Sequence, residues 1–330
     1  MWTSWLDPAL LNTVHCMDCL EFMKTLPDKC IDLICVDPPY FWVVKNDWDN
    51  QWETKQDFIN WIELFTIEWK RILKDNWSLY IFWDDKIIAY IQVMMDKYFK
   101  LENNIVWYKP NNTVQKWWSW FNMYAPMTER LLFYSNEIVN INWICVNNTR
   151  EYIRNEILKA KWKIVLKEIN QALWVADNWW WVASAVLSLE KTEPVMITEE
   201  HYYKLREWLN WWKEYEFLRK EYEELRKEYE ELRRPFNPAD NFWDVWILYK
   251  TNQSEFVWHP TQKPKQLITR IIETSSRKWD IILDCFAWSW TTGVACKELW
   301  RNYILVEKEP KYVDIIHKRL QNTTVSLFHS

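Results

Sequence analysis

Two short motifs carry the residue types that could do chemistry, and the first is Asp37-Pro38-Pro39-Tyr40. It follows the apolar segment Cys30–Val36, which is typical of a buried strand. Open α/β sheets bind ligands at the carboxyl ends of their strands. The two prolines remove both amide donors there, so carbonyl groups and one carboxylate remain as acceptors beside an aromatic ring. Such acceptors suit an amino group on a flat ring; the alternative is a stiff loop with a stacked tyrosine.

The second motif covers residues 281–293, which are predicted to form a strand, a tight loop and the start of a helix. With a glycine-rich loop this would be a nucleotide-binding turn. As printed, Trp288 and Trp290 stand where the backbone must turn sharply and approach a ligand. Tryptophan hardly adopts positive φ, and its bulk would fill the pocket. Glu307 ends the next predicted strand, 23 residues after Asp284, where an acid that binds ribose hydroxyls is expected.

Glycine and tryptophan counts are both abnormal. The 330 residues include 1 Gly and 29 Trp, whereas an average glycine usage of ~7% predicts about 23 glycines. The two counts add up to 30 residues, roughly a normal glycine share plus a normal tryptophan share. The sum indicates that most tryptophans stand where the working protein has glycine.

The elements that must position these motifs alternate between strand and helix. In the first third, a helix over Gln56–Leu73 is predicted between the strand at Cys30–Val36 and a strand at Ser78–Trp83. The C-terminal part is predicted to continue with a helix over Pro264–Ser276, a strand at Ile281–Asp284, a helix over Thr291–Leu299, a strand at Tyr303–Val306 and a helix from Pro310. This order favours a parallel sheet covered by helices.

Residues 214–234 repeat every seven positions. The apolar positions of this repeat are Tyr215, Leu218, Tyr222, Leu225, Tyr229 and Leu232. Their 3-4 spacing predicts a short helical arm with an apolar stripe, ended by Pro235. We favour an arm that packs on its own domain; packing on a partner is the alternative.

In type and order the motifs resemble the β group of DNA amino-methyltransferases, which methylate the exocyclic nitrogen of adenine or cytosine with S-adenosylmethionine. The DPPY motif comes first, then a target-recognition region, residues 259–264 (HPTQKP) and the cofactor loop. The resemblance to this family also includes residues 17–21, 107–110 and 301–307, and it covers nearly the whole chain. The resemblance implies a Rossmann-like α/β methyltransferase sheet with an inserted target-recognition region and a helical arm.

The resemblance also divides the chain into three parts. Residues 1–134 are expected to form the catalytic half of the methyltransferase domain and residues 256–330 its cofactor-binding half. Residues 135–255 are expected to be the target-recognition region, with the helical arm at 214–234.

Roles for the first motif follow from the resemblance. Asp37 and the Pro38 carbonyl are expected to accept the two N–H bonds of a flipped-out base, with Pro39 completing the rigid turn and Tyr40 stacking on the base. DPPY favours the N6 amino group of adenine. Cytosine enzymes more often carry Ser in place of this Asp, so the N4 amino group of cytosine is the alternative.

The resemblance implies a cofactor site as well. Glu307 is expected to bind the ribose, Asp18 or Cys19 to lie at the adenine edge, and Lys263 to face the methionine carboxylate. The full set expected to hold the cofactor is Asp18, Cys19, His259, Thr261, Gln262, Lys263, Asp284, Phe286, Ala287, Trp288, Ser289, Trp290, Thr291, Thr292 and Glu307. Neither a metal nor a covalent enzyme intermediate is expected.

The family pattern bears on the tryptophans too. Trp77, Trp258, Trp279 and Trp300 stand where the family usually has glycine, as do the loop tryptophans. Others look genuine, namely Trp48, Trp61, Trp107, Trp208 and Trp246. A codon read as glycine in the source but translated as tryptophan would explain the pattern, and some bacterial lineages do reassign UGA in this way. If the loop tryptophans are real, the alternative is a catalytically dead DNA-binding relative.

An acidic average hides two basic blocks. Net charge is −5, yet residues 100–167 carry +5 (10 basic, 5 acidic) and residues 259–330 carry +4 (11 and 7). On charge alone, such blocks fit either contact with a polyanion or solvated helix faces. With the resemblance, the expected partner is double-stranded DNA; an RNA methyltransferase is disfavoured by the motif order. The residues expected to contact DNA are Lys109, Arg150, Arg154, Lys159, Lys161 and Lys163. A homodimer and a cognate restriction enzyme stay open.

The seven cysteines are odd in number and scattered, so reduced thiols are expected. Cys16 and Cys19 form a Cys-x-x-Cys pair, but no second pair at zinc spacing accompanies them, which argues against a metal site. No apolar run approaches the ~18 residues of a membrane span, and no signal-peptide pattern begins the chain. A cytoplasmic protein without membrane contact is expected.

Overall fold

The computed structural model describes two compact units, one made of residues 1–137 and 234–330 and the other of residues 138–233. The residues described are 6–40, 52–110, 127–135, 151–159, 166–173, 198–209, 224, 227, 234–238, 243–249, 262–288 and 291–323.

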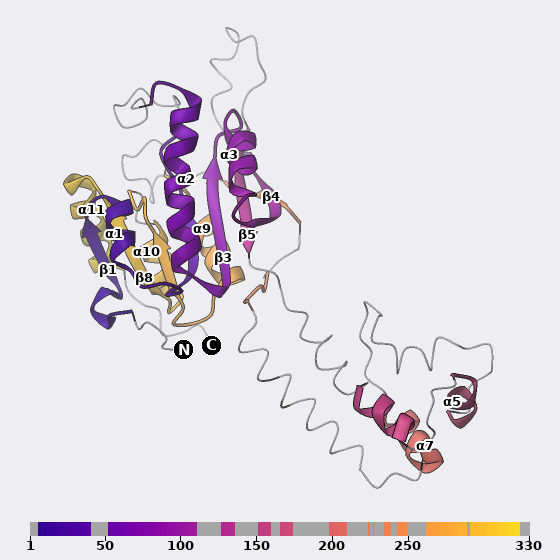
Figure 1. Ribbon diagram of the computed structural model, residues 1–330. Helices are drawn as coiled ribbons and strands as arrows, with labels where there is room; N and C mark the ends of the chain where they lie inside the picture. Colours follow the sequence, from indigo (N-terminus) through magenta and orange to yellow (C-terminus); the bar gives the residue numbers. More distant parts are fainter. Residues whose placement is uncertain are drawn as a thin grey trace. The chain divides into compact units, whose positions relative to one another are not determined.

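An eight-stranded sheet forms the first unit, in the order β1-β8-β7-β2-β3-β5-β4-β6 (Figure 1). Its strands are β1 (Thr13–Cys16), β2 (Ile31–Val36), β3 (Leu73–Trp83), β4 (Lys100–Tyr108), β5 (Thr128–Ser135), β6 (Val245–Ile247), β7 (Ile281–Asp284) and β8 (Asn302–Glu307). Strand β5 runs antiparallel to β3 and β4, and the remaining pairs are parallel. The predicted α/β sheet is therefore confirmed.

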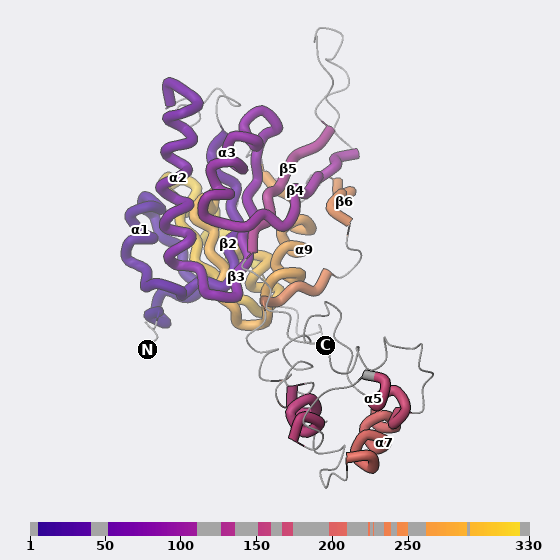
Figure 2. The backbone as a smooth tube through the Cα atoms, turned by 45° about the vertical axis from the view of Figure 1, so that its right-hand side comes forward, coloured from indigo at the N-terminus to yellow at the C-terminus, as the bar shows by residue number. Residues whose placement is uncertain are grey.

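Helices cover both faces of this sheet (Figures 1 and 2). One apolar core lies beneath α1 (Cys19–Thr25), α2 (Lys55–Ile72) and α3 (Ile88–Met95), and the other beneath α9 (Lys265–Ser275), α10 (Thr291–Glu298) and α11 (Pro310–Asn322). A short 3-10 helix, Pro8–Leu10, precedes β1. Within the described ranges, no helix combines the length and apolarity needed to cross a membrane.

Strand β2 shows why residues 33–36 are an unbroken apolar run. Ile34 and Val36 pack into the core beneath α1–α3, whereas Leu33 and Cys35 pack into the core beneath α9–α11. A parallel strand covered on both faces needs apolar side chains on both. After β2 the chain moves to β3 on one side, and β7 pairs on the other side. The carboxyl end of β2 is thus a topological switch point, where such sheets bind ligands.

Distant parts of the chain complete the sheet. Strand β1 pairs with β8 from Thr13↔Ile304 to Cys16↔Glu307, and β7 pairs with both β8 and β2. The C-terminal strands therefore lie between two N-terminal ones, and the two motifs predicted from sequence end neighbouring strands.

Predicted and observed elements agree closely around these motifs. The strand at 281–284 has the predicted bounds, and the other predicted strands and helices with stated ends differ by a few residues. The largest difference is β3, which begins at Leu73 directly after α2 and is longer than the predicted 78–83. The segment from Arg234 onward belongs to the first unit, and it supplies β6, which pairs with β4. The target-recognition role expected for residues 135–255 stays a prediction.

The second unit has its own small core of helices. Helical residues 151–159, α5 (Leu166–Ala172) and α7 (Glu199–Leu209) belong to it. Its buried side chains are Ile153, Ile157, Ile169, Leu173, Tyr202, Leu205 and Leu209. Most of the heptad arm predicted at 214–234 lies outside the described residues; Glu224 and Lys227 are helical.

Two tryptophans have backbones in the left-handed region. Trp300 (φ 61°) follows α10, and the Arg301 N–H donates to the Cys296 carbonyl at 2.9 Å, the hydrogen bond of a Schellman helix end. Trp279 (φ 74°) is the third residue of a turn closed by the Asp280 N–H on the Arg277 carbonyl, at 3.2 Å. Both positions normally hold glycine.

We predict that W279G stabilises the protein. The indole is 64% exposed, so little packing is lost, whereas relief of the left-handed backbone is worth about 1 kcal/mol. Urea unfolding measures the change in the free energy of unfolding. The control is W246G, which removes an indole that is 6% exposed and should destabilise. A W279G variant less stable than the parent chain would contradict this prediction.

Candidate active site

Asp37 lies at the carboxyl end of β2 and is 8% exposed. Its two carboxylate oxygens have different partners. Oδ1 accepts a 2.6 Å hydrogen bond from the Tyr40 hydroxyl, and Oδ2 accepts a 2.7 Å bond from the Lys263 ammonium. The motif predicted from sequence therefore places a buried carboxylate beside its own tyrosine.

Lys263 reaches this site from the segment before α9. It is 2% exposed, and its Nζ also lies 3.1 Å from the Tyr40 hydroxyl and 3.5 Å from Glu129 Oε2. A buried ammonium needs counter-charges, which is why this side chain lies between carboxylates. Sequence reasoning expected Lys263 at a cofactor carboxylate, whereas the structure pairs it with Asp37.

Burial and pairing act in opposite directions on this pair. Burial raises the pKa of Asp37, and the neighbouring Lys263 ammonium opposes that rise. For Lys263, burial lowers the pKa, but Asp37 and Glu129 outweigh it and raise the pKa above the usual lysine value. Burial also raises the pKa of Tyr40 well above its ordinary range. The tyrosine and lysine therefore keep their protons and act as donors to Asp37.

Two more carboxylates end the neighbouring strands β7 and β8. Asp284 Oδ2 accepts a 2.6 Å hydrogen bond from the Thr292 hydroxyl, and Oδ1 accepts from the Phe286 N–H at 3.1 Å. Glu307 Oε1 accepts from the Glu309 N–H at 2.8 Å. Burial raises the pKa of Asp284 to about 7 and that of Glu307 to about 7. Such carboxylates gain from additional hydroxyl or cationic donors.

Asp18 lies near Glu307 because β1 pairs with β8. The Met17 N–H donates to the Glu307 carbonyl at 3.1 Å, and Asp18 caps α1 by accepting from the Leu20 N–H at 2.9 Å. Cys19 follows and is 7% exposed. The structure therefore brings Asp18 and Cys19 to the edge where Glu307 ends its strand.

Trp288 extends from the turn after β7 to the first motif. Its indole Nε1 donates to the Asp37 carbonyl at 3.1 Å, so the ring spans from the turn to the end of β2. Of its neighbours, Ala287 is fully buried, and the Phe286 ring lies 5.2 Å from that of Phe65. The indole occupies space beside Asp37 that a glycine would leave open.

Two other predicted residues lie around Lys263. The Thr291 hydroxyl donates to the Lys263 carbonyl at 3.3 Å, and Gln262 is the residue before Lys263. The remaining predicted site residues, His259, Thr261, Ser289 and Trp290, lie outside the described residues.

The basic residues expected to contact DNA have mixed surroundings. Lys109 is 5% exposed, and its ammonium donates to Glu129 Oε1 at 2.7 Å. Arg154 and Lys159 are exposed on the second unit, and Lys159 pairs with Glu156. Arg150, Lys161 and Lys163 lie outside the described residues.

Sequence reasoning missed Glu129, which contacts both buried lysines. It lies in β5, and its only signal was a charged residue ahead of the apolar run 131–134. Among the described residues, no three His, Cys, Asp or Glu side chains gather as metal ligands.

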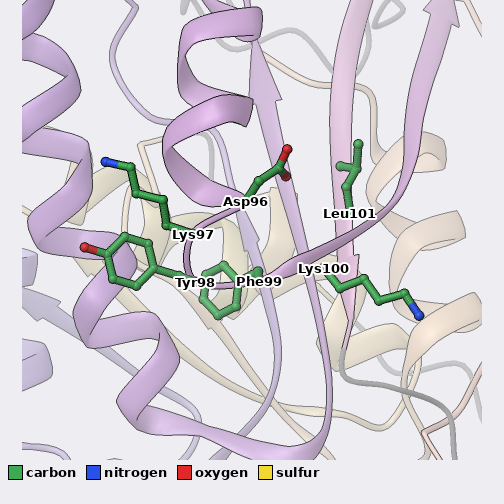
Figure 3. Close-up of a pocket in the computed structure, with 6 residues that line it drawn as sticks. All are labelled: Asp96, Lys97, Tyr98, Phe99, Lys100 and Leu101. Atoms are coloured by element: carbon green, nitrogen blue, oxygen red, sulfur yellow. The ribbon is translucent and has the colours of Figure 1, made fainter.

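A hollow at the turn between α3 and β4 is a separate feature (Figure 3). The lining residues are Asp96, Lys97, Tyr98, Phe99, Lys100 and Leu101. Lys97 and Tyr98 both contact Glu63 of α2. In the strand register, Lys100 lies opposite Ser135, and Ser135 lies opposite Ser78, the first residue of the β3–β5 ladder. The hollow therefore lies at the end of that ladder where β3 enters it, away from Asp37 at the carboxyl end of β2.

The raised pKa values predict an unusual pH dependence of stability. A carboxyl whose pKa rises on folding binds its proton more tightly in the folded state, so the free energy of unfolding increases as pH falls through that pKa. With both pKa values at about 7, Asp284 and Glu307 should stabilise the protein as pH falls from about 8 to about 6. Thermal unfolding of E307Q should show less of this increase than the unsubstituted chain. An unchanged pH dependence in E307Q would contradict it.

Comparison with solved structures supports the same architecture. The PvuII DNA methyltransferase (cytosine-N4-specific) matches with a TM-score of 0.54 at 13% identity, covering 95% of this chain and 93% of that one. TTHA0409 of Thermus thermophilus, a putative DNA modification methylase complexed with S-adenosyl-L-methionine, matches with a TM-score of 0.52 at 16% identity, covering 96% and 95%. These likenesses confirm the fold.

Sequence comparison reaches the family. The chain is 27% identical over 328 residues to the type II methyltransferase M.HinfI of Haemophilus influenzae, covering 94% of this chain and 68% of that protein. It is also 27% identical over 307 residues to the DNA adenine methyltransferase YhdJ of Escherichia coli, covering 92% and 80%. A family model described as DNA methylase matches residues 31–142 and 139–318. The chain belongs to the N6/N4 DNA methylase family.

Proposed function

We propose that the protein transfers a methyl group from S-adenosylmethionine to the N6 amino group of adenine in double-stranded DNA. The observation that carries the proposal is the buried Asp37 carboxylate, at the end of a strand whose neighbours end in the acidic residues Asp284 and Glu307. Asp37 would accept hydrogen bonds from the amino group of the base, and Asp284 and Glu307 would accept hydrogen bonds from the cofactor.

The side chains at the strand ends fit this cofactor, with one exception. Glu307 is suited to the ribose hydroxyls, and Asp18 lies beside it for the adenine edge. Asp284 and Phe286 would hold the methionine part. The exception is the Trp288 indole, which reaches the Asp37 carbonyl across the space between the two motifs. When bound, S-adenosylmethionine supplies a methyl group on a positively charged sulfur.

The chain's own residues then prepare the base. An exocyclic amino group is a poor nucleophile because its lone pair is conjugated with the ring. Asp37 and the Pro38 carbonyl would accept its N–H bonds and orient the nitrogen lone pair, which is preorganised electrostatic stabilisation. The buried Lys263 ammonium favours the ionised form of Asp37, and only that form has all its lone pairs available. Tyr40 would stack on the base, which leaves the duplex first.

Adenine is the proposed base for two reasons. The motif carries Asp37, whereas cytosine enzymes more often have Ser there, and one relative is named a DNA adenine methyltransferase. The N4 amino group of cytosine is the second candidate, favoured by the fold shared with a cytosine-N4-specific enzyme. The names of the type II relatives support a place in a restriction-modification system. Arg154 and Lys159 are proposed to contact DNA phosphates, because both are exposed.

We also propose that the natural protein has glycine at Trp77, Trp258, Trp279, Trp288, Trp290 and Trp300. Positive φ at Trp279 and Trp300 supports this, as does the position of the Trp288 indole. These three positions have different needs: two require a left-handed backbone, and one requires space.

Mass spectrometry can identify the natural residues at these positions. We predict that peptide 279–297 from the native source has the mass expected for glycine at positions 279, 288 and 290. Each exchange of tryptophan for glycine changes the peptide mass by a large and unambiguous amount. A peptide with tryptophan at all three positions would contradict the glycine proposal and favour a DNA-binding relative without activity.

Methyl transfer tests the proposed function. The sextuple variant W77G/W258G/W279G/W288G/W290G/W300G is expected to transfer labelled methyl groups to duplex DNA and not to RNA. The chain with tryptophan at all six positions is expected to transfer none. In that background D37N should lower kcat by about 100-fold, because an amide cannot match the carboxylate as an acceptor. The matched control is D75N, which changes an exposed carboxylate. Equal rates in D37N and D75N would contradict the role of Asp37.

A further inference from the structure

Glu129 lies between two buried lysines. Its Oε1 accepts a 2.7 Å hydrogen bond from Lys109, and its Oε2 lies 3.5 Å from the ammonium of Lys263, which in turn donates to Asp37. The strand ladder holds Glu129 and Lys109 in place, because β5 and β4 pair at Trp107↔Glu129 and the Lys109 N–H donates to the Met127 carbonyl. A chain of alternating charges therefore runs from Lys109 through Glu129 and Lys263 to Asp37.

We propose that Glu129 is a positioning residue for methyl transfer: its carboxylate, itself held by Lys109, keeps the Lys263 ammonium in place beside Asp37. The inference rests on the proposed function, and it assigns roles to Glu129 and Lys109 inside the site.

Lysine needs such support because its stem is flexible and its ammonium is a point charge. Around Lys263 the aromatic rings of Tyr40 and Phe82 lie 5.4 Å and 5.0 Å from Nζ. These rings attract the cation from their faces but do not fix its position along a hydrogen bond. The second carboxylate supplies a fixed anion, so the ammonium remains shared between Asp37 and Glu129 instead of being drawn wholly to Asp37. Asp37 then keeps acceptor capacity for the amino group.

The charge balance points the same way. Lys109 and Lys263 carry two positive charges, and Glu129 and Asp37 carry two negative charges, so the buried chain is neutral overall. A reaction with a positively charged sulfonium brings another cation close to Asp37. Without the Glu129 charge, the buried groups would carry a net positive charge and repel it.

A pH dependence follows from the same contacts. The charge of Glu129 raises the pKa of Lys263, together with that of Asp37. Other titratable groups face the same cluster: Tyr40 and Lys109 by contact, and Asp84 and Asp284 through their charges. The Cys35 thiol is also near, but burial raises its pKa well above the usual value, so it stays neutral. Loss of the Glu129 charge therefore lowers the pKa of Lys263. The lysine then loses its proton at a lower pH, and the activity that depends on its charge is lost there.

The test compares E129Q with E102Q in the sextuple variant. Glu102 is the matched control, because it lies on the neighbouring strand β4 and accepts a 2.9 Å hydrogen bond from Ser135. E129Q is expected to lower kcat by about tenfold or more, because it removes the negative charge that faces the Lys263 ammonium at 3.5 Å. The alkaline limb of its pH–rate profile should move to lower pH, and E102Q should change neither.

E129D is the second variant. It keeps the charge but shortens the reach, so the alkaline limb should return toward its original pH while kcat stays reduced. If thermal unfolding shows that E129Q does not fold, E129D replaces it in the test. The kcat of E129D must then be lower than the kcat of its control, E102D. Variants at Glu129 with the kcat and pH profile of their Glu102 controls would overturn the inference. Absence of methylation by the parent sextuple variant would instead contradict the proposed function, so the two failures are distinct.

Discussion

The ion pair between Lys263 and Asp37 is the interaction on which the site depends. The two residues are 226 positions apart in the chain and meet at 2.7 Å in a buried environment. Breaking such a pair by removing one partner leaves an uncompensated buried charge, which is strongly destabilising. The pair therefore joins the DPPY turn to the segment that leads into α9, and through Thr291 to the start of α10. Residues that would bind a cofactor and residues that would bind a base are held as one structure.

Sheet topology makes that pair possible. Because β7 and β8 pair between β1 and β2, three acidic residues from distant segments end neighbouring parallel strands: Asp37, Asp284 and Glu307. Burial of these carboxylates has a cost, which is visible in the raised pKa values of all three. Asp37 has a resident cation, whereas Asp284 and Glu307 have a hydroxyl and backbone N–H groups. The difference separates the proposed base site from the proposed cofactor site.

Sequence was most informative where a local rule decides structure. Two prolines after an apolar run predicted the Asp37 turn, and strand–turn–helix order predicted β7 and α10 with nearly correct bounds. The family resemblance, not a local rule, singled out Trp279 and Trp300 as glycine positions, and both have positive φ. Partners across long separations were not predictable: neither the pairing of Lys263 with Asp37 nor the place of Glu129 between two lysines has a sequence signal. Strand β6 was not predicted, because a three-residue strand has almost no pattern.

The central claim is that Asp37 presents the amino group of adenine for methylation. The most direct measurement is mass spectrometry of the nucleosides released from duplex DNA after reaction with S-adenosylmethionine and the sextuple variant. The account predicts N6-methyldeoxyadenosine. N4-methyldeoxycytidine as the product would contradict the choice of base, and the absence of any methylated nucleoside would contradict the claim that this site transfers a methyl group.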